Sequence, residues 1–222
     1  MKSVLFIGNS FTFFNDMPAM VQNICNFRHD QIHTAKLTYG GYYLDQYLQP
    51  GTDANDRLCS LLEGAGWDYV VLQEQSSCPA VETQRFFRAS EELCARIRQI
   101  GAEPVFYETW AYRNSLGLRK NLLLSYEAFA EKQFAAYEQA AQDNHACCIP
   151  VGRCFDAAVH VGLYERLISA NDDYHPTLAG SYLAAVCFSH FLCPDLTVEW
   201  APDTLEPDFS KSLCQYARSE RF

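Results

Sequence analysis

The chain has 222 residues, of which 49% are hydrophobic, and its 17 lysines and arginines stand against 27 aspartates and glutamates. This length supports one sizeable core and is short for two, so we expect a single domain over residues 1–222. The net charge of −10, with no run rich in lysine or arginine, disfavours nucleic acids and anionic membrane surfaces as partners. No apolar stretch approaches the roughly 20 residues that cross a bilayer, so we expect no membrane span.

The first apolar run ends after Ile7 at Gly8-Asn9, which is too early for the hydrophobic region of a secretory signal. Ten cysteines would suggest a disulfide framework in an exported chain, but none of them forms the C-x-x-C pair of zinc ribbons and thioredoxin-type sites. We therefore expect a cytoplasmic protein with reduced thiols.

Short β-type runs alternate with helical patterns along the chain, which is typical of a parallel sheet wrapped by helices. We predict five strands, at residues 4–7, 34–39, 68–72, 104–107 and 146–151. Helices are predicted over residues 17–27, 83–100, about 121–142 and 177–192. The tail at about residues 194–222 carries three prolines and is expected to pack along the surface. The predicted fold class is α/β, in a three-layer α/β/α arrangement.

Polar residues that follow the strands are the candidates for chemistry, because open parallel sheets bind ligands at the carboxyl ends of their strands. Ser10 follows the first predicted strand, and Asp172 and His175 stand just before the last helix. A serine becomes an effective nucleophile when a base takes its proton and a carboxylate orients that base. On a turn, the three-residue spacing can fold Asp172 back onto the imidazole Nδ1, which leaves Nε2 for Ser10. The pattern raises the hypothesis of a Ser10, His175, Asp172 triad.

Each of these motifs also has an ordinary structural interpretation. Gly8-Asn9-Ser10 alone is a common strand-to-helix turn, a lone histidine is usually structural, and Asp172 and His175 can cap a helix. The combination favours catalysis, because all the elements fall at strand ends or at a helix start. Two other motifs are excluded: no Gly-Lys-Ser/Thr of a phosphate-binding loop follows the first strand, and Thr12 replaces the second glycine of a nucleophile elbow.

The chain resembles the SGNH hydrolases of the GDSL esterase/lipase superfamily. Gly8-Asn9-Ser10 is similar to the family's first block, Gly-Asp-Ser, and Asp172-x-x-His175-Pro176 is similar to its last block. The resemblance implies a flavodoxin-like, five-stranded parallel sheet between helices. It also implies an esterase that needs no cofactor and no metal. Ser10 would be its nucleophile and first oxyanion donor, His175 the base and then the acid, and Asp172 the partner that orients the histidine.

The resemblance leaves the other oxyanion donors open. The glycine of the second family block is matched by Gly41, with Gly40 as the alternative. The usual Gly-x-Asn-Asp of the third block is absent, and residues 70–76 occupy its place. Since some relatives of carbohydrate acetylesterase type use a glutamine there, Gln73 is the first candidate and Gln75 the second. Both would point to the same side of an extended strand.

Aromatic residues make up 14% of the chain, and part of this excess falls in loops after the predicted strands. We expect Trp110 and Tyr112 to form a stacking surface for a sugar ring, with Arg113 or Phe13 as a further wall. The alternative is that these aromatic residues close the core at a strand end.

The leading functional hypothesis is a serine esterase that hydrolyses a small acyl ester, in particular an acetyl group on a carbohydrate. One alternative is a lysophospholipase or thioesterase, which would need a longer apolar groove for the acyl chain. Another is a non-catalytic ligand-binding module on the same fold, which the departure in the third block keeps open.

Overall fold

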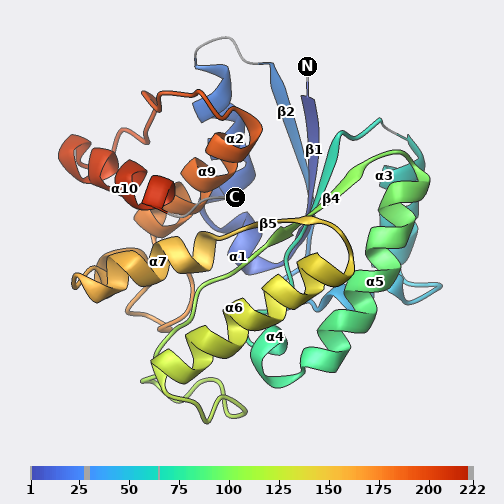
Figure 1. The fold of residues 1–222 in the computed structure, drawn as a ribbon, viewed down its shortest axis with the longest axis horizontal. Coiled ribbons are helices and arrows are strands. Elements are labelled where there is room, and N and C mark those ends of the chain that lie inside the picture. The colour runs from blue at the N-terminus through green and yellow to red at the C-terminus, as the bar shows by residue number, and fades with distance from the viewer. Residues whose placement is uncertain (1, 28–30, 65, 220–222) are drawn as a thin grey trace.

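A computed structural model describes residues 2–27, 31–64 and 66–219 of the chain. In this part of the chain the centre is a five-stranded sheet of order β2-β1-β3-β4-β5, in which every neighbouring pair is parallel (Figure 1). The strands are β1 (Lys2–Gly8), β2 (Ile32–Thr38), β3 (Tyr69–Leu72), β4 (Glu103–Tyr107) and β5 (Cys147–Ile149). The three central strands are buried except at their first residues, as continuous apolar strands covered on both faces must be.

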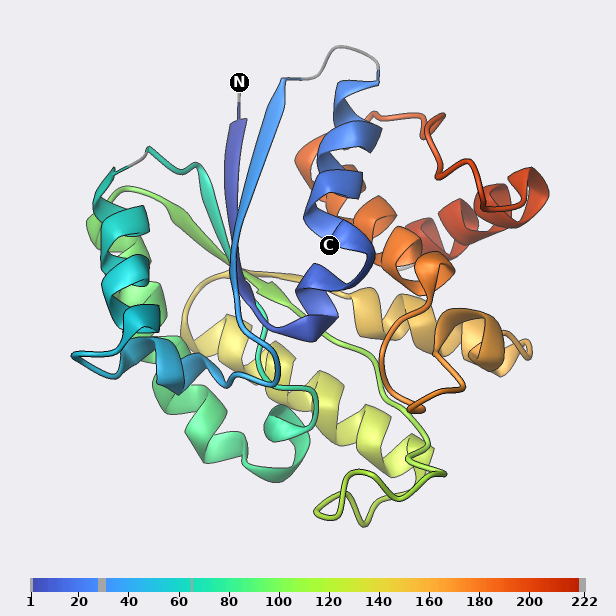
Figure 2. The ribbon, with the colours of Figure 1, turned by 180° about the vertical axis from the view of Figure 1, so that it is seen from behind.

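Helices cover both faces of the sheet, as the opposite views in Figures 1 and 2 show. One layer contains α2 (Met17–Asn26), α7 (Val151–His160), α9 (Leu178–Leu192) and α10 (Pro207–Ser219). The other contains α3 (Asp53–Gly64), α5 (Thr83–Gln99) and α6 (Tyr126–Asp143). Short helical segments are α1 (Ser10–Phe13), η1 (Phe14–Asp16), η2 (Leu44–Leu48), α4 (Cys78–Val81) and α8 (Tyr164–Leu167).

Two hydrophobic cores follow from the alternation of side chains along the strands. In β1, Val4 and Phe6 enter one core, and Leu5 and Ile7 enter the other. Because successive side chains of a strand point to opposite faces, an unbroken apolar strand supplies both cores at once. The three-layer α/β/α fold class predicted from the sequence is therefore confirmed.

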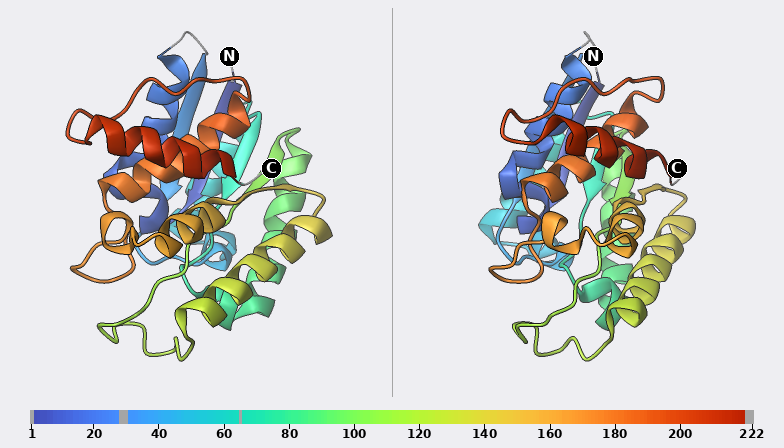
Figure 3. Two further views of the ribbon diagram at one scale, coloured as in Figure 1. Left: turned by 60° about the vertical axis from the view of Figure 1, so that its left-hand side comes forward. Right: turned by 90° about the vertical axis from the view of Figure 1, so that its left-hand side faces the viewer.

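All five predicted strands and all four predicted helices are present, with ends that differ by a few residues. The largest difference is at α6, which begins at Tyr126 because the Ser125 hydroxyl caps it by accepting the N–H of Ala128 at 3.2 Å. Helices α3, α7 and α10 were not predicted from the sequence. The last of these lies in the tail, where it packs against α9 and α7 on the side away from the sheet (Figure 3).

Two further observations concern the whole described chain. No helix in residues 2–27, 31–64 or 66–219 combines the length and the apolar character needed to span a membrane. The ten cysteines, which all lie in these ranges, form no disulfide bond with one another.

We expect Gly180→Ala to destabilise the protein, although alanine is the better helix former. A Cβ at Gly180 would lie 2.3 Å from the carbonyl oxygen of Leu167, which is backbone and cannot rotate away. Overpacking of this kind costs roughly 1–3 kcal/mol, and each kcal/mol lowers Tm by about 2–4 °C in a chain of this size. Thermal unfolding measures the loss. Gly64→Ala is the control, because a Cβ there meets open space; equal Tm values for the two variants would contradict the expectation.

Candidate active site

Ser10 stands directly after β1, as the first residue of α1, and it is 8% exposed. Asn9 holds this turn with both ends of its side-chain amide. Its Oδ1 caps α1 by accepting the N–H of Phe11 at 3.1 Å, and its Nδ2 donates to the carbonyl of Tyr42 at 2.9 Å. One side chain therefore shapes the serine turn and fastens it to the loop that follows β2.

His175 connects Ser10 to Asp172. Its Nε2 lies 2.7 Å from Ser10 Oγ, and its Nδ1 lies 2.8 Å from Asp172 Oδ2. The second carboxylate oxygen, Oδ1, accepts the backbone N–H of Tyr174 at 3.2 Å and of His175 at 3.0 Å. The backbone thus orients the carboxylate, and the carboxylate orients the ring. Because a carboxylate only accepts hydrogen bonds, it selects the tautomer with the proton on Nδ1, and Nε2 is left to accept from the serine hydroxyl.

The surroundings of the two titratable groups fix their protonation. Burial is the largest influence on His175 and lowers its pKa, while the hydrogen bond and charge of Asp172 act in the opposite direction. For Asp172, burial raises the pKa, but the hydrogen bonds from His175 and Tyr174 together outweigh it, and the pKa is lowered. At neutral pH the site therefore holds a neutral imidazole beside a carboxylate, the pairing in which Nε2 can take a proton.

Aromatic rings enclose the imidazole of His175. Phe14 stacks on it with ring centres 4.2 Å apart and an angle of 7° between the planes. The ring of Tyr174 lies 4.2 Å away, and Phe11 contacts the imidazole edge-on at 5.9 Å. These contacts restrict the ring to one orientation. The sequence analysis did not identify Phe14, because only the fold brings it to the histidine.

The loop after β2 lies beside the serine turn. The N–H of Tyr39 donates to the carbonyl of Gly8 at 3.3 Å, and Asn9 holds Tyr42 from the other side. Gly40 and Gly41, the two candidates for an oxyanion donor, lie between these anchors. Gly41 adopts a φ of 72°, in the left-handed region that favours glycine. Within the described residues, the N–H groups of Ser10 and Gly41 have no hydrogen-bond acceptor.

Gln73 does not present its amide nitrogen to the serine, as the sequence analysis expected. It is fully buried, and its Oε1 accepts the N–H of Asn9 at 2.8 Å and the hydroxyl of Thr12 at 2.9 Å. Its Nε2 donates to the carbonyl of Glu74. The physical reason is that the serine turn carries two donors on its inner side that need an acceptor. Gln73 is thus a support behind the turn, and the prediction that it donates to an oxyanion is wrong.

Gln75 lies just before the turn that leads into α4. Its Oε1 accepts the N–H groups of Ser77 at 3.0 Å and Cys78 at 3.2 Å, and its Nε2 donates to Ser76 Oγ at 3.0 Å. No contact of Gln75 with Ser10 or His175 is present, so its assignment as an oxyanion donor stays a prediction.

Glu74 is a buried acid that the sequence analysis passed over. Its Oε1 accepts the N–H groups of Leu44 at 3.1 Å and of Gln75 at 2.5 Å, which joins the loop after β2 to the end of β3. Burial raises the pKa of Glu74 to about 8, so it is mainly protonated at neutral pH. The available signal was an acidic residue two positions after an apolar strand.

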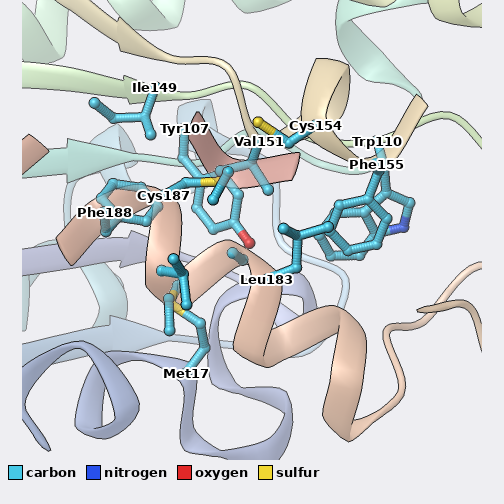
Figure 4. Packing of buried hydrophobic residues seen from close by; sticks show 14 of the residues in the cluster. Met17, Tyr107, Trp110, Ile149, Val151, Cys154, Phe155, Leu183, Cys187 and Phe188 are labelled. Carbon is cyan, nitrogen blue, oxygen red and sulfur yellow. The ribbon is translucent and has the colours of Figure 1, made fainter. Parts of the chain in front are cut away.

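Trp110 and Tyr112 lie in the core and do not form a stacking surface. Trp110 has no exposed surface and is sandwiched between Phe11 and Phe155, each with ring centres 4.4 Å away. Figure 4 shows the rings of Trp110 and Phe155 lying against each other. Tyr112 is 1% exposed, and its hydroxyl contacts Ser76 Oγ at 3.2 Å. Since protein groups already occupy these rings, the predicted sugar platform is wrong and the core interpretation holds.

The other two wall candidates lie nearer the surface. Arg113 pairs with Glu165 at 2.9 Å and stacks over Tyr164 at 4.0 Å, so its charge is satisfied within the protein. Phe13 is half-buried and packs on Phe14 with ring centres 5.7 Å apart. A contact between either residue and a substrate stays a prediction. In the described ranges, no three His, Cys, Asp or Glu side chains gather in a way that could hold a metal ion.

No family model matches the sequence, and no curated protein matches it significantly. A solved structure from Slackia heliotrinireducens, described as a candidate SGNH hydrolase, is 30% identical over 86% of this chain and 98% of its own, with a TM-score of 0.77.

Two further structures are similar in fold. A Bacteroides uniformis protein, from a family named only by number, is 19% identical over 98% of this chain and 93% of its own, with a TM-score of 0.84. A catalytic mutant of an acetylxylan esterase from Geobacillus stearothermophilus is 10% identical over 91% of this chain and 97% of its own, with a TM-score of 0.59.

We expect Trp110→Ala to act on stability first. Removing a fully buried indole from between two rings costs roughly 3–5 kcal/mol, through lost burial and the cavity left behind. The indole N–H also donates to the carbonyl of Tyr174, next to His175, at 3.0 Å. Denaturant unfolding measures the effect, and Leu123→Ala, in the same loop but 91% exposed, is the control. A Trp110→Ala protein as stable as the control would contradict the core assignment.

Proposed function

Because this chain belongs to the SGNH hydrolase superfamily, we propose that it is a serine esterase that hydrolyses small acyl esters, with an acetyl group on a carbohydrate as the first candidate. The observation that carries the proposal is the continuous hydrogen-bond chain from Ser10 through His175 to Asp172. The carbohydrate assignment draws support from the fold shared with the acetylxylan esterase structure.

In the proposed reaction, Ser10 Oγ attacks the ester carbonyl while His175 Nε2 takes the hydroxyl proton. The carbonyl π electrons move to its oxygen, and the negative charge of Asp172 stabilises the imidazolium that forms. Collapse of the tetrahedral intermediate expels the alcohol, which receives the proton from Nε2 and leaves an acyl group on Ser10. A water molecule then repeats the sequence, with Nε2 first as base and then as acid, and releases the carboxylic acid.

The developing oxyanion needs donors that are in place before the reaction. We propose the backbone N–H groups of Ser10 and Gly41 for this task, because both lack an acceptor among the described residues. The hydrogen bond from Asn9 to Tyr42 holds the two segments together, so the donors need not be reorganised as charge develops. A third donor from Gln75 would require that side chain to leave Ser76.

We expect Ser10→Ala to lower kcat/KM on aryl acetates by at least about 10³-fold, since the nucleophile is removed. A fluorophosphonate probe should label the unmodified protein and not the variant. Ser212→Ala, in α10, is the matched control and should behave as the unmodified protein. Comparison of aryl acetate, butyrate and long-chain esters then assigns the acyl length. A higher kcat/KM on long-chain esters than on acetate would favour a lysophospholipase or thioesterase. If the probe does not label the protein and no turnover depends on Ser10, a ligand-binding module would be favoured.

The pH dependence should follow His175. Burial lowers its pKa from the ordinary value of 6.5, and the base is active only when neutral. As the pH rises through this pKa, the imidazole loses its proton, so kcat/KM should rise and reach half its plateau below pH 6.5. In Asp172→Asn, loss of the negative charge should shift the midpoint to lower pH, and the plateau should fall by about 10⁴-fold. A midpoint clearly above 6.5, with the fold intact by circular dichroism, would count against His175 as the base.

A further inference from the structure

A guanidinium without an acidic partner stands beside the catalytic turn. We propose that Arg119 binds a carboxylate of the substrate, so that the preferred ester is one that also carries a carboxylate. This inference rests on the esterase function proposed above and adds the substrate class to it. It contrasts with the net charge of −10, which disfavours anionic partners for the protein as a whole.

The loop that carries Arg119 is fastened to the catalytic turn through Asp173. This carboxylate is 6% exposed and lies between Asp172 and Tyr174 in the sequence. Its Oδ2 accepts both the N–H and the hydroxyl of Ser115, and its Oδ1 accepts the hydroxyl of Tyr164 at 2.8 Å. The loop between β4 and α6 is therefore bound to the same turn that presents His175.

The position of Arg119 within this loop is also fixed. Its backbone N–H donates to Asn114 Oδ1 at 2.9 Å, and Asn114 Nδ2 donates to its carbonyl at 3.0 Å. Asn114 has a φ of 54°, a conformation that asparagine adopts more readily than most residues. These two hydrogen bonds close the loop and fix the backbone position from which the Arg119 side chain extends.

The guanidinium lies over the ring next to the histidine. Arg119 Cζ is 4.0 Å from the centre of the Tyr174 ring, and that ring is 4.2 Å from the imidazole of His175. The positive charge of Arg119 also acts on His175. Together with burial, which is the larger influence, it lowers the pKa of the imidazole. The reacting carbonyl must contact Ser10, so a group bound by Arg119 would be part of the same small substrate.

Arg119 differs from the other arginines that stack on aromatic rings. Each of those also pairs with a carboxylate: Arg85 with Asp45, Arg113 with Glu165, Arg153 with Glu108, and Arg166 with Glu206. Among the described residues, the side chain of Arg119 has no ion pair and no hydrogen bond, and its buried Nε has no acceptor.

A substrate carboxylate would satisfy this group. Arg119 is half-buried with its Nε inside, so its terminal Nη groups are the donors open to a ligand, and a planar guanidinium can bind a carboxylate through two parallel hydrogen bonds. Stacking on Tyr174 leaves the edge of the guanidinium free for such a pair. Binding of one carboxylate by Arg119 is compatible with the net charge of −10, because it depends on one or two short-range contacts and not on a positively charged surface.

The test compares two acetate esters of one shape, 4-acetoxybenzoate and its uncharged methyl ester, each corrected for its rate with hydroxide. We expect the unmodified protein to prefer the carboxylate. In Arg119→Met the ratio of the two kcat/KM values should fall by about tenfold or more, mainly through KM, as loss of a charged hydrogen-bonded pair predicts. Arg119→Lys should recover part of the ratio. Arg166→Met, a stacked arginine paired with Glu206, is the control and should leave the ratio unchanged.

Binding measured without turnover separates this inference from the esterase proposal. Calorimetry on Ser10→Ala should detect 4-acetoxybenzoate, and the double variant with Arg119→Met should bind it at least about tenfold more weakly. Equal ratios in the Arg119→Met and unmodified proteins, or equal binding in the calorimetric pair, would overturn the carboxylate assignment while leaving Ser10-dependent hydrolysis intact. If binding depends on Arg119 but no hydrolysis depends on Ser10, the esterase proposal alone would be overturned.

Discussion

The hydrogen bond between Ser10 Oγ and His175 Nε2 joins residues that are 165 positions apart, and each end has its own support. On the serine side, the end of β3 supplies Gln73, whose Oε1 accepts two donors of the serine turn. A Cβ at Gly8 would lie 2.5 Å from this same oxygen, so the turn and its support approach as closely as glycine allows. On the histidine side, Trp110 holds the catalytic turn by its indole N–H. The segments that follow β3 and β4 therefore hold the two ends without contributing a catalytic group.

The sequence was sufficient for the fold because its central strands are apolar on both faces, a pattern that is typical of a parallel sheet covered by helices. It was also sufficient to bring Ser10, Asp172 and His175 together as a hypothesis, because strand ends and a helix start place them at one edge. It did not predict α3, whose buried face consists only of Ala54, Asn55, Leu58 and Leu62, set among charged residues. That pattern is weaker than the one in α5, where six buried positions repeat.

The functions of individual side chains could not be obtained in the same way. Gln73 has a donor end and an acceptor end, and the end that faces the serine depends on Asn9 and Thr12, which sequence alone does not place beside it. Trp110 follows a strand, as a wall residue would, but its faces are covered by Phe11 and Phe155 from distant segments. In both cases the deciding neighbours come from another part of the chain, so local pattern carries no information about them.

The position of Arg119 near His175 could not be predicted from the sequence either, and it has a consequence for catalysis. In the free protein, burial and the charge of Arg119 both lower the pKa of His175, while Asp172 raises it. A carboxylate paired with Arg119 would cancel most of that positive charge and leave Asp172 as the nearest unbalanced one. The pKa of His175 would then rise on binding, and its affinity for the Ser10 proton would increase when substrate is present. Recognition and base strength would be coupled through one guanidinium, with no movement of the backbone required.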